Sequence, residues 1–218
     1  MKQKWKKKPN DLRRYTDLSA LIYLLAEQKL TLRDPANWDD KNDSYYLSLY
    51  KESSKDLKSV LALCFVTCSE RYHFWQIFGT GRNGVRIRFK SGELFRAVQD
   101  HPGLRMERVR YRLLENIGDV PIRQFPFVKR YGFKDESEFR MVYESLDKIS
   151  KFDIPIPLSC IRNIKLNPWL PSDLFPHVKE VIQGIKGCDS LEILHSHLID
   201  NEEWKSAGDK AVAKITSH

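Results

Sequence analysis

The chain has 218 residues, with 37 Lys and Arg against 29 Asp and Glu, and a formal net charge of +8. Apolar residues make up 41% of it, enough to offset the entropy that a chain loses on folding, so the composition excludes a disordered protein. The sequence contains no run of about 18 apolar residues and no apolar segment near its start, so we expect neither a membrane span nor a secretory signal.

Four cysteines occur, at Cys64, Cys68, Cys160 and Cys188. Their spacing fits neither a zinc ribbon nor a C-x-x-C redox pair. Cys64 and Cys68 lie in an apolar run, where a free thiol behaves as a small hydrophobe. Free thiols of this kind predict a reducing, cytoplasmic location.

The first eight residues, MKQKWKKK, contain five lysines and one tryptophan. One interpretation is a solvated tail. The other is an arm that binds phosphates through residues such as Lys4, Lys6 and Lys7, with Trp5 stacking on a base. We therefore predict a basic, flexible arm over residues 1–11.

The first half of the chain predicts a strand over 12–16, an amphipathic helix over 18–28 and a short strand over 29–33. The segment DPANWDDKND, residues 34–43, is a turn-rich loop with several carboxylates, and a polar helix is expected over 44–58. The nearly continuous apolar run at 60–67 is typical of a strand that is buried on both faces.

The second half predicts strands over 85–89, 106–111, 137–143 and 161–166, with a helix over 92–99. A helix over 173–186, a closing strand over 191–199 and a frayed end follow. Strands do not alternate regularly with helices, which argues against a doubly wound fold. We predict one α+β domain over residues 12–200, a strongly twisted mixed β-sheet with flanking helices, and a C-terminal tail over 201–218.

The segment KDESEFRMVY, residues 134–143, is the most informative for chemistry. Side chains alternate across a strand, so Glu138 and Arg140 share one face, while Phe139 and Met141 share the core face. An exposed surface ion pair would explain the first face. A carboxylate and a supporting guanidinium on a cleft wall are the alternative, although spacing alone favours the surface pair because charged residues mostly lie outside.

The glycines of GTGRNG, residues 79–84, match neither a dinucleotide-binding nor a phosphate-binding loop, and they indicate a turn. His195 and His197 could share a strand face, but no third ligand has a convincing spacing, so we expect no metal. Alternation pairs Arg86 with Arg88, and Arg108 with Arg110. These arginines and the lysine arm predict salt-sensitive binding to nucleic acid.

Several short motifs occur in a fixed order. They are LRRYT at 12–16, PANWDDKND at 35–43, WQIFG at 75–79, GVRIRF at 84–89, V-x-Y at 109–111, and Lys129 followed by Glu136, Glu138, Phe139 and Arg140. In this combination the sequence resembles the bacterial DUF2971 family. It departs from the family pattern at four positions, which are Thr16, Asp39, Lys41 and Phe78.

The layout of that family is similar to ADP-ribosyltransferases of the DarT type. This resemblance implies an ADP-ribosyltransferase-like fold and an enzyme that uses NAD to modify a nucleic acid or a protein. It further implies a toxin or phage-defence effector, with an antitoxin or another defence-system protein as partner.

The same resemblance implies roles for particular residues. Glu138 would be the catalytic carboxylate and Arg140 its supporting cation, because cleavage of the nicotinamide–ribose bond passes through an oxocarbenium-like state. A guanidinium would hold the diphosphate and an aromatic ring the nicotinamide. The NAD contacts would come from Arg14, Tyr15, Thr16, Trp75 and Phe78. Independently, the place of Trp75 just before a glycine-rich turn predicts that it lines the central cleft.

Two other functions stay open on the sequence. One is a non-catalytic module that binds nucleic acid through the lysine arm and the basic strands. The other is a metal-dependent nuclease built on Asp39, Asp40, Glu136 and Glu138, which requires carboxylates around one shared point.

Overall fold

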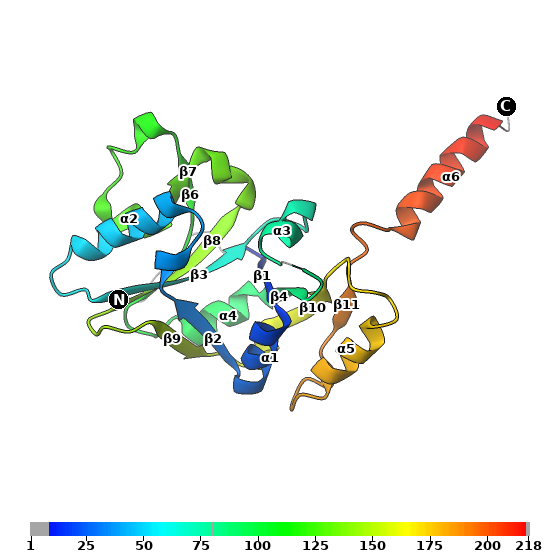
Figure 1. The fold of residues 1–218 in the computed structure, drawn as a ribbon, viewed down its shortest axis with the longest axis horizontal. Coiled ribbons are helices and arrows are strands. Elements are labelled where there is room, and N and C mark those ends of the chain that lie inside the picture. Colours follow the sequence, from blue (N-terminus) through cyan, green and yellow to red (C-terminus); the bar gives the residue numbers. More distant parts are fainter. Residues whose placement is uncertain (1–8, 80, 217–218) are drawn as a thin grey trace.

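A nine-stranded β-sheet runs through the centre of the protein, seen here in a computed structural model that describes residues 9–79 and 81–216 (Figure 1). Seven strands follow the order β11-β10-β4-β1-β3-β2-β9, and β8 pairs with β3 and β5. The strands are β1 Asp11–Asp17, β2 Lys29–Arg33, β3 Ser59–Val66, β4 Gly84–Lys90, β5 Leu104–Arg108, β8 Glu138–Ser145, β9 Lys151–Pro155, β10 Ile161–Leu166 and β11 Ile193–His195. Only β10 and β11 pair in parallel among them, so the sheet is mixed and mostly antiparallel.

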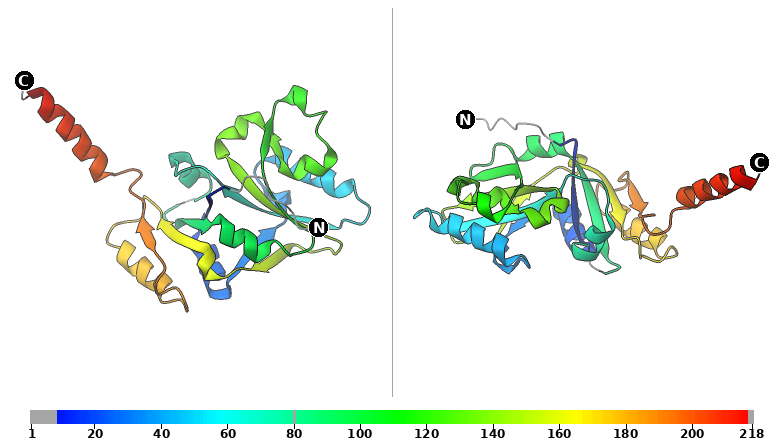
Figure 2. Two further views of the ribbon diagram at one scale, coloured as in Figure 1. Left: turned by 180° about the vertical axis from the view of Figure 1, so that it is seen from behind. Right: turned by 90° about the horizontal axis from the view of Figure 1, so that it is seen from above.

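Helices flank this sheet. They are α1 Leu18–Glu27, α2 Lys41–Glu52, α3 Tyr72–Ile77, α4 Ser91–Val98, α5 Phe175–Gln183 and α6 Glu202–Thr216. The protein therefore has the predicted α+β architecture of a mixed sheet with flanking helices. Helix α6 lies within the predicted C-terminal tail, and in Figure 2 it extends away from the rest of the fold.

Strand β3 is buried on both faces, as its apolar run predicts. Leu61, Leu63 and Phe65 belong to the main core, which α1 and α4 help to close. On the opposite face, Val60 and Ala62 pack with Leu47 of α2 in a second cluster. The apolar alternation along β3 thus joins two cores, one on each side of the sheet.

The sheet divides along one edge of β3. There β1 pairs with β3 only at Arg13 and Val66, and β2 pairs with it only at Arg33 and Ala62. The opposite edge of β3 pairs with β8 along its whole length. Between the two single pairs, β1 and β2 diverge, and the edge of β3 between residues 62 and 66 is left facing the space between them.

Three predicted elements differ from the structure. The strand expected over 106–111 is two strands, because β5 ends at Arg108 and β6 (Arg110–Arg112) pairs with β7 (Val128–Arg130) in a separate parallel sheet. Strand β11 covers only three of the residues in 191–199. Helix α2 begins earlier than predicted, at Lys41, because the Asp40 carboxylate caps it and accepts the Asn42 N–H at 3.1 Å.

Among the described residues, no helix combines the length and the apolar character needed to cross a bilayer.

Candidate functional site

A cavity of about 510 Å³ opens in the split between β1 and β2. Its floor is the edge of β3 from Ala62 to Val66, which is unpaired between these two positions. Strand β1 contributes Arg13, Arg14 and Tyr15, and the end of α3 contributes Ile77 and Phe78. The remaining lining comes from Thr31 and Arg33 of β2, from Asn37, Trp38, Asp39, Asp40 and Asp43 at the start of α2, and from Lys129, Phe133, Glu136 and Glu138.

Glu138 lies on the cavity wall and is held by Arg140. The Arg140 Nε donates to Glu138 Oε1 at 2.7 Å, and its Nη2 donates to Oε2 at 2.9 Å. The other side of the same guanidinium donates to both Asp43 oxygens, at 2.8 and 2.7 Å. Arg140 is fully buried and Glu138 is 3% exposed, so the surface ion pair considered from the sequence is wrong.

The guanidinium of Arg140 is completely occupied. Besides the four bonds to carboxylates, its Nη1 donates to the Pro126 carbonyl at 2.9 Å, and its Cζ lies 5.0 Å from the centre of the Trp38 ring. A guanidinium has five N–H donors, and here all of the donating positions have partners. Arg140 does not line the cavity, so it supports Glu138 without reaching a ligand itself.

Lys129 joins the remaining carboxylates. Its ammonium lies 2.6 Å from Glu136 and 3.7 Å from Glu138. It also lies 3.8 Å from Asp43 and 4.0 Å from Asp40, and its side chain is 9% exposed. We call Asp40, Asp43, Lys129, Glu136, Glu138 and Arg140 the charged cluster. It holds four carboxylates against two cations.

Within the charged cluster, burial and ion pairing change the pKa values of the carboxyl groups in opposite directions. Burial by itself would raise the pKa of Glu138, but Arg140 and then Lys129 outweigh it, and the pKa is lowered. Burial raises the pKa of Glu136 above its usual value in spite of Lys129. Glu138 is therefore the member of this pair that stays ionised most readily.

Arg14 gives the cavity a cation of a different kind. Its Nη1 donates to the backbone carbonyl of Cys64, on the open edge of β3, at 3.4 Å. Within the described residues, no carboxylate forms an ion pair with it, and burial lowers its pKa. A half-buried guanidinium without a carboxylate partner is suited to bind an anionic group of a ligand.

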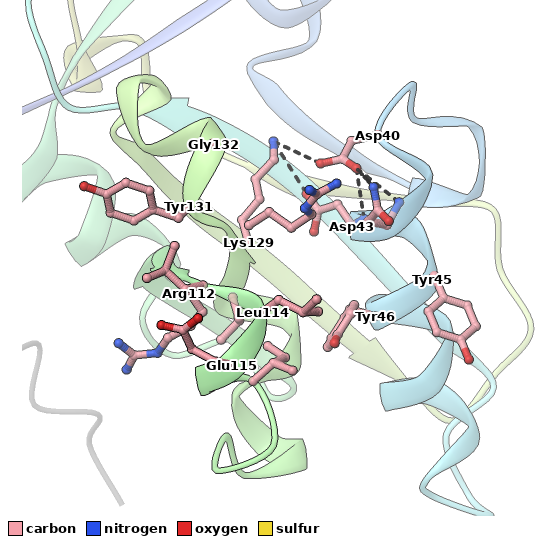
Figure 3. A pocket seen from close by; sticks show the side chains of 15 residues that line it. Asp40, Asp43, Tyr45, Tyr46, Arg112, Leu114, Glu115, Lys129, Tyr131 and Gly132 are labelled. Carbon is pink, nitrogen blue, oxygen red and sulfur yellow. Dashed lines mark hydrogen bonds and ion pairs between the residues drawn. The ribbon is translucent and has the colours of Figure 1, made fainter.

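A second cavity, of about 670 Å³, lies on the other side of the charged cluster, and Asp40, Asp43 and Lys129 line both cavities. In Figure 3, Lys129 reaches from β7 toward Asp40 and Asp43 at the start of α2. Beyond these three residues, the lining of this cavity consists mostly of aromatic and aliphatic side chains, with two arginines. It is lined by Tyr45, Tyr46, Arg112, Leu113, Leu114, Ile117, Arg130 and Tyr131, among others.

Four of the residues predicted to bind or cleave NAD meet in the smaller cavity, namely Arg14, Tyr15, Phe78 and Glu138. Trp75 does not. It is completely buried, its ring packs edge-on to Tyr15 at 5.0 Å, and its indole N–H donates to Glu70 at 2.9 Å. The prediction that Trp75 lines the cleft is therefore wrong. Thr16 lies next to Tyr15 on β1 but lines neither cavity.

The residues predicted to bind nucleic acid do not form one surface. Arg86 is 7% exposed and lies 3.6 Å from Glu70, and Arg88 donates to Asp11 at 2.6 Å. The prediction is wrong for Arg86, because the alternating strand that carries it is buried. Arg110 is exposed and, with Arg112, lines a third cavity of about 290 Å³. Lys4, Lys6 and Lys7 lie outside the described residues.

The carboxylates of the nuclease alternative come together in part. Asp40, Glu136 and Glu138 converge, but on the Lys129 ammonium, which lies where a shared cation would be needed. The described residues contain no group of three His, Cys, Asp or Glu side chains with the geometry to hold a metal ion. The arrangement therefore does not support the two-metal or one-metal chemistry of a nuclease.

Sequence reasoning missed Asp43, Trp38 and Cys64 as parts of this site. Asp43 and Trp38 lie in the loop that precedes and begins α2, and only its excess of carboxylates was a signal. Cys64 lies opposite Arg140 in the β3–β8 register and lines the cavity, where burial raises the pKa of its thiol well above the usual value.

No family model matches the chain, and no curated protein sequence matches it. Solved structures of Thermus sp. 2.9 DarT are similar. DarT in complex with ADP-ribosylated ssDNA has 11% identity and a TM-score of 0.46 over 90% of this chain and 98% of that chain. DarT in complex with NAD+ has 13% identity and a TM-score of 0.45, over 88% and 98%. A similarity this distant assigns no activity, and membership of the DUF2971 family stays a prediction.

Proposed function

We propose that this protein is an ADP-ribosyltransferase that uses NAD as substrate and transfers ADP-ribose to a macromolecule, with nucleic acid as the foremost acceptor. The observation that carries the proposal is the composition of the 510 Å³ cavity. It combines the oriented carboxylate of Glu138 with aromatic side chains and with the half-buried guanidinium of Arg14, which pairs with no carboxylate among the described residues. Its volume is in the range of small-molecule sites, about 300–1,000 Å³.

The charges of the cavity match the charges of NAD. Guanidinium groups come from β1 and β2, through Arg13, Arg14 and Arg33, and suit a diphosphate. Carboxylates come from the segment before α2, through Asp39 and Asp40, and from Glu138 of β8, and suit the cationic nicotinamide riboside end. Tyr15 and Phe78 offer ring surfaces against which a planar base can pack.

Glu138 is the residue we assign to the reacting end. The bond between ribose C1′ and the nicotinamide nitrogen breaks, and its electron pair leaves with neutral nicotinamide. The ribose is left with oxocarbenium character, which a nearby carboxylate stabilises. A carboxylate has about four acceptor positions, and Arg140 uses one on each oxygen, so Glu138 keeps capacity for a ribose hydroxyl.

The 670 Å³ cavity supports the acceptor side of the proposal. It shares its wall with the NAD cavity and presents tyrosine rings together with Arg112 and Arg130 (Figure 3). Ring surfaces and arginines are the groups that bind bases and phosphates of single-stranded nucleic acid. The acceptor's nucleophilic atom forms the new bond to C1′ and loses its proton. A toxin or defence role for this transfer is the corresponding expectation in the cell.

The test is Glu138→Gln, which keeps the shape and removes the charge. Release of nicotinamide and transfer of labelled ADP-ribose to single-stranded DNA, RNA and protein are measured for the purified chain. We expect the wild type to be active and the variant to be slower by about a hundredfold or more, as for loss of one aligned electrostatic group.

Glu144→Gln is the matched control, because Glu144 lies on the same strand and pairs with another buried arginine, Arg105, at 3.0 Å, away from both cavities. We expect this control to retain wild-type rates. An inactive wild type, or equal rates for wild type and Glu138→Gln, would overturn the proposal.

A further inference from the structure

Asp43 borders the NAD cavity, but both of its carboxylate oxygens are taken by Arg140, and it is one of the most buried charged side chains among the described residues. The residue is 3% exposed, and both of its carboxylate oxygens accept bonds from Arg140. That geometry belongs to an ionised carboxylate. Burial raises the pKa of Asp43, so the structure bears a cost in keeping this group charged beside Glu138.

The hydrogen bonds of Arg140 form a relay, which connects Asp43 to Glu138. Asp43 holds one edge of the Arg140 guanidinium, and Arg140 holds Glu138 by two parallel bonds. The planar guanidinium is rigid, so a rotation at one edge moves the other. Asp43 comes from α2 and Glu138 from β8, so the relay fixes the orientation of a sheet residue to a helix on the other side of the site.

We propose that Asp43 is a positioning residue for Glu138 that acts through Arg140 in the NAD reaction. The inference rests on the proposed function and assigns to it a residue that does not touch the substrate. Arg140 alone would not suffice, because without Asp43 two of its five N–H donors would face no acceptor in a fully buried place, and the guanidinium would turn to find one.

The test is Asp43→Asn. The asparagine oxygen can accept from one Nη group, while its NH2 group opposes the other, so the guanidinium loses its alignment. We expect kcat for nicotinamide release to fall about ten- to a hundredfold, the effect of a misplaced reacting group, with KM for NAD changed less than threefold because the cavity contacts to NAD are intact.

The pH profile separates positioning from general damage. Glu138 is faced by charged or titratable groups from every neighbouring element, which are Asp40, Asp43, Cys64, Tyr111, Lys129, Glu136 and Arg140. Loss of the negative charge of Asp43 removes one repulsive neighbour, so the acid limb of kcat moves to lower pH in Asp43→Asn. Asp43→Glu restores the charge, and we expect it to return the acid limb to its wild-type position with part of kcat.

Glu144→Gln is again the matched control. Arg105 is a buried arginine that donates to Glu144 at 3.0 Å and to Glu107 at 3.1 Å and packs on the Phe127 ring, as Arg140 packs on Trp38. This arginine clamp does not border the NAD cavity. We expect its loss to lower the unfolding midpoint without changing kcat or the acid limb, with rates normalised to folded protein by circular dichroism.

Two results would overturn the inference and leave the proposed function intact. One is a wild-type kcat and acid limb in Asp43→Asn, and the other is the same relative loss of kcat in Asp43→Asn and Glu144→Gln. If the wild type releases no nicotinamide, the proposed function fails. In that event the carbon-13 carboxyl resonance of Glu138, assigned with Glu138→Gln, decides the positioning role. A shifted titration in Asp43→Asn supports it, and an unchanged one overturns it.

Discussion

Lys129 is the cation whose removal should affect the charged cluster most clearly, and the test requires no knowledge of the reaction. Four carboxylates lie within 4.0 Å of its ammonium, and its side chain is 9% exposed. Lys129→Met keeps the length of the side chain and its packing on the Phe133 ring, which lies 4.6 Å from the ammonium. The change therefore removes a charge and little volume.

The expected cost follows from the contacts. One unit-charge pair at about 4 Å is worth roughly 4 kcal/mol at the effective dielectric constant of a partly buried site, before desolvation. The variant no longer has to bury an ammonium, and the desolvation free energy saved in this way offsets most of the attraction lost from the four contacts. Removal of one partner from a buried ion pair costs about 3–5 kcal/mol, and we expect Lys129→Met to lower the free energy of unfolding by that amount at about pH 7.5.

The pH dependence carries the sharper prediction. Without Lys129, the carboxylates of Asp43 and Glu138 share only Arg140, and Glu136 loses its ion pair. The pKa values of Asp43 and Glu136 are already raised in the folded wild type, and they rise further in the variant. A carboxyl group with a raised pKa takes up its proton in the folded state first, so the folded variant is favoured as pH falls and disfavoured as pH rises.

The penalty of Lys129→Met should therefore shrink as pH falls from about 7.5 toward 5.5. Each unit by which one carboxyl pKa rises is worth about 1.4 kcal/mol, and we expect the penalty to decrease by about 1–2 kcal/mol. Urea unfolding of wild type and variant at both pH values measures it. Lys151→Met is the control, because Lys151 is 57% exposed and pairs with a single carboxylate, Asp153, at 3.2 Å. A penalty that is equal at both pH values would refute the reasoning.

Two further predictions concern the ligands. Arg14→Gln should raise KM for NAD by about ten- to a hundredfold with little change in kcat, because one charge-assisted contact to an anion is lost. Stability should not fall, because no carboxylate among the described residues pairs with this guanidinium. Exposed Arg96→Gln is the control, and an unchanged KM in Arg14→Gln would exclude Arg14 from the anion site. The double change Arg110→Gln with Arg112→Gln should weaken binding to single-stranded nucleic acid and make it less dependent on salt, measured by fluorescence anisotropy, whereas the exposed Arg82→Gln should not; an unchanged salt slope would remove these two arginines from the interface.

Local pattern was sufficient for the elements with strong apolar periodicity. The continuous apolar run predicts β3 and its burial on both faces, and the alternation of EFRMVY places Glu138 and Arg140 on one face of β8. Capping could also be read locally in part, since Asp17 begins α1 by accepting the Ala20 N–H at 2.9 Å. Each of these features depends on side chains within a few residues of one another, which the sequence displays directly.

The partners of those side chains depended on the tertiary structure. Sequence alternation allowed an exposed Glu138–Arg140 pair, and the burial of that pair follows from α2 and the Pro126 segment covering this face of β8. Trp75 was predicted at the cavity from its place before a glycine-rich turn, but its indole packs inward because Glu70 accepts its N–H. Arg86 reads like Arg88 in the sequence, yet only the contact with Glu70 decides that it is a buried ion-pair member.

The site itself was divided between the two sources of information. The sequence and the resemblance were enough to name residues that could supply a carboxylate, a guanidinium and an aromatic ring, namely Glu138, Arg14, Tyr15 and Phe78. That these four line one cavity depends on the split at the edge of β3, where β1 and β2 each pair at a single position. Asp43 and Lys129 lie 95 and 9 residues from Glu138 in the sequence. Charge pairing in the buried cluster brings these three side chains together, and no local sequence pattern predicts that pairing.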